Sequence, residues 1–164
     1  MLSVDLAPLS NGQHDLVLTP EADALGLDPE TFSDIEVEAR LDYHNYDVQH
    51  RRLVIRLDAS ATAKLECDRT LATYEERISG EHTALFSATA DPEDDEVTLL
   101  GPDEQAVDLA EAVRETLLLA LPMRRVAPEA RDLPIDTTFG AQTDTDGTPI
   151  DPRWEALRSL RNPK

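Results

Sequence analysis

Apolar and polar positions alternate strictly along two long stretches of the chain. In residues 34–43 the odd-numbered positions, from Ile35 to Tyr43, are apolar or aromatic, and the even-numbered positions are charged. Residues 53–67 repeat the pattern over a longer distance. A period of two is typical of a strand with one buried face. Because the second stretch exceeds a typical strand of about 5–6 residues, we expect a bend or bulge near its alanines.

Further segments extend this sheet. Residues 2–8 alternate as a short strand, and an apolar run at 16–18 marks another. The sequence HNYD at 44–47 is the expected turn between the strands at 34–43 and 53–67. A third strand is expected at 74–88. Successive strands with short connections predict an antiparallel meander. The acidic run at 88–97 is expected to be a solvated loop.

One helix with an apolar face is predicted over residues 108–121. Asp108 is its expected N-cap, and Glu111 occupies the partner position of a capping box. Pro122 ends the pattern. The apolar positions recur at helical spacing at Val107, Ala110, Val113, Leu117, Leu118 and Leu121.

Two shorter helices are also predicted. Thr19 is the expected N-cap of the first, with Pro20 at its first helical position and Gly26 at its end. The second covers 151–160 near the C-terminus. Proline, glycine, threonine and aspartate predict an extended loop over 123–150.

These elements define an α+β fold built on a mostly antiparallel sheet meander, with one long packed helix and a short C-terminal helix. Residues 1–122 are expected to form a single domain, and residues 123–164 a loop-rich C-terminal extension. Whether the sheet curls into a partial barrel stays open at this point.

The charge of the chain is strongly acidic. Asp and Glu number 34 against 15 Lys and Arg, which gives a formal net charge of −19. Such an excess repels nucleic acid at long range. Two explanations remain: adaptation to a high-salt cytoplasm, as in halophilic proteins, or the need to bind a basic protein partner.

Several functional classes find no support in the sequence. No apolar run is long enough to cross a membrane, and the N-terminus lacks the features of a secretory signal. The single cysteine, Cys67, cannot form an internal disulfide, which suits a cytoplasmic location. No phosphate-binding glycine loop or zinc-protease motif is present.

Cys67 follows the apolar face of its strand, which favours a small buried residue. The alternative is a thiol-dependent enzyme using Cys67, which would require a nearby base and partial exposure. A zinc site would require four ligands.

Three motifs in order carry a family resemblance. LECDRT around Cys67 is similar to the LxCxRC signature of the YceD family, the large ribosomal RNA subunit accumulation proteins. The segment from Val107 to Pro122 resembles the family's helix ending in Leu-Pro, and a DPR segment follows near the C-terminus. The matching positions are Cys67, Arg69, Asp108, Leu109, Glu115, Leu121, Pro122, Asp151, Pro152 and Arg153.

The chain departs from this family at its cysteines. Many members carry a second cysteine in CxRC and more after the helix, which look like a zinc site; here Thr70 replaces the second, and MRRVAPEARDLP at 123–134 contains none. The comparison therefore implies no metal and no cofactor, with Cys67 as a remnant. Without a metal, residues 123–150 are expected to lose the clip that would order them.

The resemblance implies a non-enzymatic accessory factor in large ribosomal subunit assembly or ribosomal RNA accumulation. Its partner would be ribosomal RNA or a basic ribosomal protein of the subunit precursor, with no membrane and no small-molecule substrate. The acidic strand positions Glu36, Glu38, Asp42 and Asp58 would repel phosphate. Candidate contacts are therefore the arginines after the helix, with local ion pairing as the alternative: Arg124, Arg125, Arg131, Arg153, Arg158 and Arg161.

Overall fold

The structure is a computed structural model that describes residues 2–47, 50–89 and 97–134. The chain separates into two units, Met1–Arg131 and Asp132–Lys164, and the architecture below is that of the first. Its elements are β1 (Ser3–Asp5), β2 (Gly12–Leu18), a 3-10 turn η1 (Ala22–Leu25), β3 (Phe32–Asn45), β4 (Arg51–Glu66), β5 (Thr73–Ser87), β6 (Val97–Leu99), β7 (Ala106–Asp108), α1 (Ala110–Leu119) and a 3-10 turn η2 (Pro128–Ala130).

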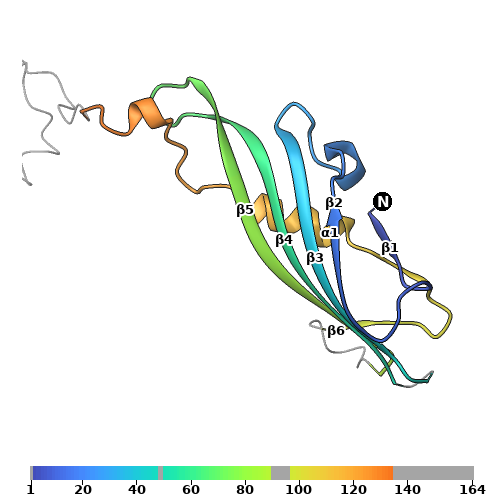
Figure 1. The fold of residues 1–164 in the computed structure, drawn as a ribbon. Helices are drawn as coiled ribbons and strands as arrows, with labels where there is room; N and C mark the ends of the chain where they lie inside the picture. The colour runs from blue at the N-terminus through green and yellow to red at the C-terminus, as the bar shows by residue number, and fades with distance from the viewer. Residues whose placement is uncertain (1, 48–49, 90–96, 135–164) are drawn as a thin grey trace, which may run out of the picture. The chain divides into compact units, whose positions relative to one another are not determined.

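The main element of the fold is one curved sheet with the strand order β2-β3-β4-β5-β6 (Figure 1). Strands β2 to β5 are antiparallel neighbours, which confirms the predicted meander. The parallel pairing of β5 with β6 was not predicted. In the described residues the order is open, with β2 and β6 at its edges, so the sheet does not close into a barrel.

The inward face of the sheet forms the core. The alternating positions of β3 and β4 are buried as predicted, and their relative exposure is at most 4% from Val37 to Tyr43 and from Leu53 to Leu65. The antiparallel pair β1–β7 and helix α1 cover this face (Figure 1). Each fully buried Leu or Ile side chain contributes about 1.5–3 kcal/mol, so this pattern is the main source of stability.

Small residues let helix α1 approach the sheet closely. Ala59 of β4 and Gly80 of β5 are paired neighbours on the inward face. A Cβ atom on Gly80 would lie 2.9 Å from Cγ2 of Thr116 and 3.1 Å from the Thr116 carbonyl oxygen. The small residues at Ala59 and Gly80 therefore leave room for the helix.

The predicted bulge lies on the neighbouring strand. Between Ser33 and Glu36 the register of β3 shifts against β4, opposite Ala61, and Asp34 has φ 49°. The extra residue keeps both Phe32 and Ile35 buried, although they differ in parity. Strand β4 itself pairs with β5 without a shift, so the expectation of a bulge in β4 was wrong in its location.

The start of the helix also differs from the prediction. Leu109 is the N-cap, and no side-chain capping bond is formed there. Asp108 instead pairs with Ser3 in the β1–β7 ladder. Its Oδ1 accepts from the backbone N–H of Ala110 at 2.9 Å and of Leu2 at 3.0 Å. The capping box fails because the ladder holds Asp108 in a strand.

The helix predicted after Thr19 is only a 3-10 turn. It begins at Ala22, with Glu21 as its N-cap, and ends at Gly26, whose φ is 66°. Thr19 and Pro20 lie before it, so their predicted roles were wrong. The chain must turn back at once, since Leu27 N–H donates to the Ala22 carbonyl at 2.9 Å. One turn cannot offset the cost of helix nucleation.

Candidate functional site

The turn between β4 and β5 contains the CDRT sequence. Cys67 N–H donates to the Ala72 carbonyl at 2.9 Å, and Leu71 N–H donates to the Cys67 carbonyl at 2.8 Å. Leu71 takes a left-handed conformation with φ 58° and is exposed. A branched residue rarely adopts this conformation, so the turn holds its shape at some conformational cost.

Cys67 itself is fully buried, as predicted. It lies just after the end of β4, in a small cluster with Ala127 and Ala130 that is separate from the main core. The Ala127 N–H donates to Sγ at 3.4 Å. The turn and the segment after the helix are thus brought together through Cys67.

Asp68 makes a two-way connection to the same segment. Its N–H donates to the Arg125 carbonyl at 2.7 Å. In return, the Arg125 N–H donates to Asp68 Oδ2 at 2.7 Å. A carboxylate that accepts from a backbone amide forms one of the stronger hydrogen bonds in proteins.

Arg69 supplies a further link. Its Nη1 donates to the carbonyl oxygens of Ala130 and, at 3.3 Å, of Arg131. These are the carbonyls of the 3-10 turn η2 and of the residue after it. The arginine of the family motif therefore positions the segment after the helix, and its guanidinium is not free for an outside partner.

These contacts correct one expectation. Residues 123–150 were expected to lose their order without a metal clip, but the described part at 125–131 is held by the hydrogen bonds from Cys67, Asp68 and Arg69. Hydrogen bonds that satisfy backbone polar groups in this way can hold the segment in place without a metal. Residues 135–150 lie outside the described residues.

The hydrogen bonds also change the acidity of the thiol. The Thr70 side chain and then the Ala127 N–H lower the pKa of Cys67 from 9.0 to about 7, against the opposing effect of burial. Thr70, which stands where the family has a second cysteine, therefore acts on the sulfur as a hydrogen-bond partner. Within the described residues, the hydrogen-bond partners of the Cys67 sulfur include no histidine.

Three candidate arginines lie at the junction at Cys67, by which we mean the Cys67 turn packed against residues 125–131. Arg124, Arg125 and Arg131 are exposed, and Nη2 of Arg131 lies 3.7 Å from Oε1 of Glu76. A shallow depression of about 290 Å³ is lined by Arg124, Arg131, Glu76 and Val126. The exposed guanidinium groups are suited to phosphate or carboxylate.

The other motif positions are distributed differently. Leu109 is buried at the start of α1, Glu115 is exposed, and Leu121 and Pro122 are half-buried beyond its end. These residues support the helix and do not join the Cys67 junction. The remaining candidates fall outside the described residues: Asp151, Pro152, Arg153, Arg158 and Arg161.

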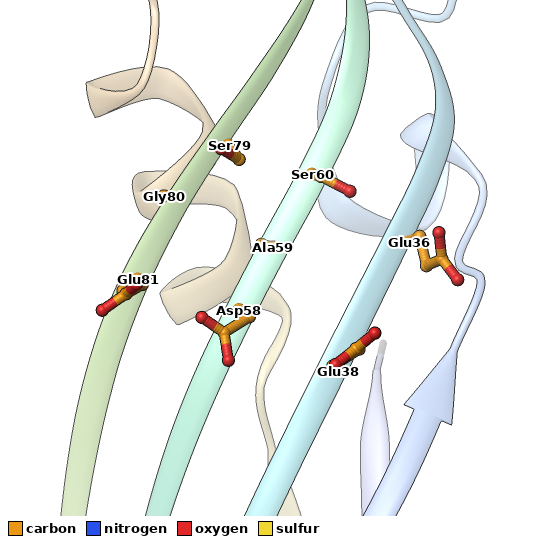
Figure 2. A pocket seen from close by; sticks show the side chains of 8 residues that line it. All are labelled: Glu36, Glu38, Asp58, Ala59, Ser60, Ser79, Gly80 and Glu81. Atoms are coloured by element: carbon orange, nitrogen blue, oxygen red, sulfur yellow. The ribbon is translucent and has the colours of Figure 1, made fainter.

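The outer face of the sheet carries the predicted acidic positions. Glu36, Glu38 and Asp58 surround a depression of about 490 Å³ together with Glu81 of β5 (Figure 2). The register places Glu38, Asp58 and Glu81 in one row across three strands. The floor of the depression is made of small residues, Ala59, Ser60, Ser79 and Gly80.

One buried cation was missed. Arg51 is 4% exposed and donates to Tyr43 Oη at 3.2 Å and to the carbonyls of Gly101, at 2.9 Å, and Glu104. It anchors the loop after β6 to the sheet. Its odd number, shared with the inward positions of β4, was the available signal.

Two further observations concern membranes and metals. In the described part of the chain, no helix combines the length and apolar character needed to span a bilayer. Over the same residues, no group of three or more His, Cys, Asp or Glu side chains is arranged to hold a metal ion.

The fold and this junction define a small α+β domain in which the Cys67 turn packs against the segment after helix α1. The family model described as large ribosomal RNA subunit accumulation protein YceD matches residues 55–161. This is more than half of the chain, so the chain belongs to the YceD family. No match is found among curated proteins or among solved structures. The family indicates a role in assembly of the large ribosomal subunit.

Proposed function

We propose that this protein is a non-enzymatic accessory factor that contacts the precursor of the large ribosomal subunit through the junction at Cys67. The observation that carries this proposal is the packing of the Cys67 turn against residues 125–131, which presents Arg124, Arg125 and Arg131 outward. The arginines of the C-terminal segment, from Arg153 onward, are proposed as further contacts with the precursor. The role places the protein in the cytoplasm.

A non-enzymatic role is supported by the state of the thiol. Cys67 has no exposed surface, and a nucleophile requires access and a positioned base. Its lowered pKa follows from hydrogen bonds from the Thr70 side chain and from the Ala127 N–H, the second of which also holds the segment after the helix. We therefore assign Cys67 a structural role.

The direct test uses charge reversal. A variant with Arg124→Glu, Arg125→Glu and Arg131→Glu, and a second with Arg153→Glu, Arg158→Glu and Arg161→Glu, should keep the circular dichroism spectrum of the wild type. Exposed substitutions usually change stability by less than about 0.5 kcal/mol. Both variants should lose co-sedimentation with large-subunit precursors, because the positive charge that meets phosphate is reversed.

A matched control reverses three basic residues elsewhere. Lys64→Glu, Arg77→Glu and Arg114→Glu make the same change of net charge at other exposed positions. This control should still co-sediment. Equal loss in the control would show a general charge effect, and unchanged co-sedimentation in the two test variants would overturn the proposed surface.

A second candidate function is binding of a basic protein. The row of carboxylates formed by Glu38, Asp58 and Glu81 on the outer face favours it. A basic ribosomal protein would be drawn to such a row by complementary charge. Loss of a basic ribosomal protein from the precursor complex in the Asp58→Asn, Glu81→Gln variant would support this candidate.

A further inference from the structure

Three arginines meet on the outer face of the sheet near the β3–β4 connection. Arg40 lies on β3, and Arg52 and Arg56 lie on β4. The register places Arg40 directly opposite Arg56, and Arg52 opposite His44. All three arginine side chains are exposed. The outer face was expected to be negative, but at this end its arginines outnumber the neighbouring carboxylates Asp15 and Asp42.

The arrangement does not serve stability. Like charges directly opposite each other on neighbouring strands are destabilising. Within the described residues, no carboxylate lies within 4.0 Å of the guanidinium nitrogens of Arg40, Arg52 or Arg56. Asp15 is opposite Arg40 in the register, and Asp42 is engaged with His44 at 3.1 Å. The three positive charges therefore remain available to a ligand.

The surface between these arginines is hollowed. A depression of about 440 Å³ is lined by Arg40, Arg52 and Arg56. Asp15 and Asp42 also line it, so its three positive charges outnumber two carboxylates. A second, of about 400 Å³, shares Arg52 and His44 with the first and continues to Tyr46. The two form one shallow path across the end of the sheet.

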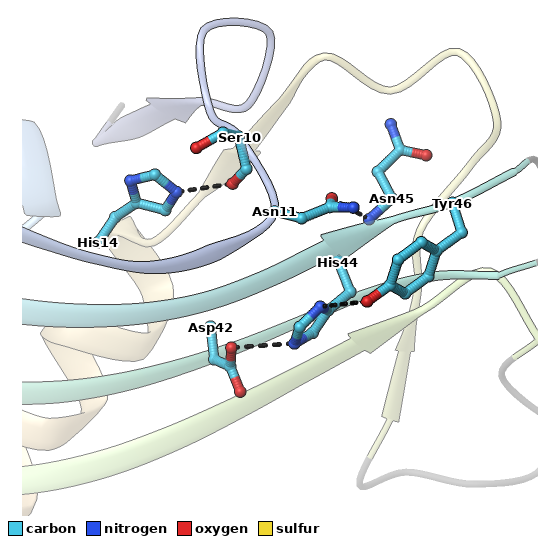
Figure 3. A network of polar contacts seen from close by, with 7 residues as sticks. All are labelled: Ser10, Asn11, His14, Asp42, His44, Asn45 and Tyr46. Carbon is cyan, nitrogen blue, oxygen red and sulfur yellow. Dashed lines mark hydrogen bonds and ion pairs between the residues drawn. The ribbon is translucent and has the colours of Figure 1, made fainter.

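An aromatic platform stands at the end of this path. The rings of His44 and Tyr46 are stacked, with centroids 5.8 Å apart and an angle of 17° between their planes. The Tyr46 hydroxyl and His44 Nδ1 are 3.3 Å apart, and His44 Nε2 is 3.1 Å from Asp42 Oδ1, which fixes both rings (Figure 3). Tyr46 is nevertheless 71% exposed. An exposed ring held in this way can stack on a nucleic-acid base.

We infer that this end of the sheet binds a single-stranded RNA segment. Arg40, Arg52 and Arg56 contact its phosphates, and Tyr46 stacks on one of its bases. A cationic path combined with an aromatic side chain is how proteins bind single strands without reading their sequence. The inference rests on the proposed function for the identity of the nucleic acid.

This site is separate from the junction at Cys67. Arg52 and Cys67 lie near opposite ends of β4, which at about 3.3 Å per residue places them roughly 50 Å apart. The carboxylates of the row Glu38, Asp58 and Glu81 occupy the face between the two ends and repel phosphate. The RNA segment is therefore confined to the basic end.

The test measures binding of a fluorescein-labelled 16-mer oligouridylate by fluorescence anisotropy, at several salt concentrations. The variant Arg40→Gln, Arg52→Gln, Arg56→Gln should bind more weakly, and its log–log salt slope should be smaller by about 2, since each phosphate contact on a single strand contributes about 0.7. Tyr46→Leu should weaken binding by roughly 5- to 150-fold, whereas Tyr46→Trp, which keeps an aromatic ring, should bind as well as the wild type.

Arg77→Gln is the matched control on the same face. Arg77 is exposed and lies 3.7 Å from Glu36 in the acidic half, so its loss should leave the affinity unchanged. An unchanged affinity in the triple variant, or equal loss in Arg77→Gln, overturns the inference. Displacement of the RNA by polyglutamate as effectively as by unlabelled oligouridylate would assign the surface to an acidic protein segment and also overturn it.

Co-sedimentation separates this result from the proposed function. Wild-type protein that binds oligouridylate but does not co-sediment with large-subunit precursors contradicts the proposed function and leaves the inference standing. Wild-type protein that co-sediments but does not bind oligouridylate overturns the inference alone.

Discussion

The backbone N–H of Ala127 donates to the Sγ of Cys67 at 3.4 Å, across 60 residues of sequence. This contact closes the chain after the helix onto the β4–β5 turn. It also stabilises the thiolate, which an N–H donor favours over the thiol. Cys67, which stands where the family signature suggests a metal ligand, thus holds the segment after the helix through a hydrogen bond.

The stability of the protein should depend on the ionisation of Cys67. Because the folded pKa is about 7 and the ordinary value is 9.0, the contribution is complete above pH 9 and is lost as the pH falls through 7. The free energy of unfolding, measured by urea titration, should therefore fall between pH 9 and pH 7. The same measurement on Cys67→Ala should lack this component.

Thr70 gives a sharper version of the same experiment. Thr70→Val removes the hydroxyl and keeps the shape, so the pKa of Cys67 should rise and the pH window should move toward 9. Absorbance of the thiolate near 240 nm reports the titration directly. A titration that is the same in Thr70→Val and the wild type would contradict the assigned cause.

The contact between strand β5 and helix α1 should tolerate no added volume at Gly80. Gly80→Ala places a Cβ atom 2.9 Å from Thr116 Cγ2, and overpacking of this kind costs about 1–3 kcal/mol. Ser79→Ala, at the exposed neighbouring position, should be nearly neutral. Thermal unfolding of the two variants measures the difference.

Rescue at Thr116 distinguishes a local clash from a general effect of the substitution. Thr116→Ser removes Cγ2 and keeps the hydroxyl that donates to the Ala112 carbonyl at 2.7 Å. The double variant with Gly80→Ala should recover part of the loss, because the Thr116 carbonyl remains at 3.1 Å. Simple additivity of the two changes would exclude the steric explanation.

The sequence predicted what depends on local periodicity. The alternation from Val37 to Tyr43 and from Leu53 to Leu65 identified the strands and their buried faces, because one face of each strand meets the core. Burial of Cys67 followed from the same pattern. The family resemblance was confirmed by the match over residues 55–161.

What it could not predict depends on pairing between distant segments. The ladder partner of Asp108 is Ser3, and no local pattern shows that this pairing excludes a capping box. The basic end of the outer face exists because Arg40 and Arg56 share a register position, which is fixed by the turn between strands. Separately, each of them is one charge on a polar face.

Arg51 should be essential for stability although it is a charged residue on a strand. It donates to the carbonyls of Gly101 and Glu104 and to Tyr43 Oη, so Arg51→Met would leave these acceptors without their donor. The expected loss is about 2–3 kcal/mol in the free energy of unfolding. Arg51→Lys should not restore it, since one ammonium group cannot span the separate acceptors.

The exposed neighbour provides the control for Arg51. Arg52→Met should change stability by less than about 0.5 kcal/mol, because Arg52 points outward from the same strand. Chemical denaturation of the three variants compares them directly. Equal stability of Arg51→Met and Arg52→Met would show that the loop after β6 does not depend on this anchor.

The acidic row should make stability depend on salt. Asp58 lies between Glu38 and Glu81 in the register, and the whole chain carries a net charge of −19. At low salt, Asp58→Asn should raise the free energy of unfolding by about 0.2–1 kcal/mol, because it removes repulsion from both sides. In molar salt, where the screening length is about 3 Å, this gain should vanish and the wild type itself should melt at a higher temperature.

Asp15→Asn is the matched control, since Asp15 is exposed on the same face but lies opposite Arg40, so its loss should not stabilise. If the wild type melts at the same or a lower temperature as salt rises, self-repulsion of the acidic surface does not limit its stability.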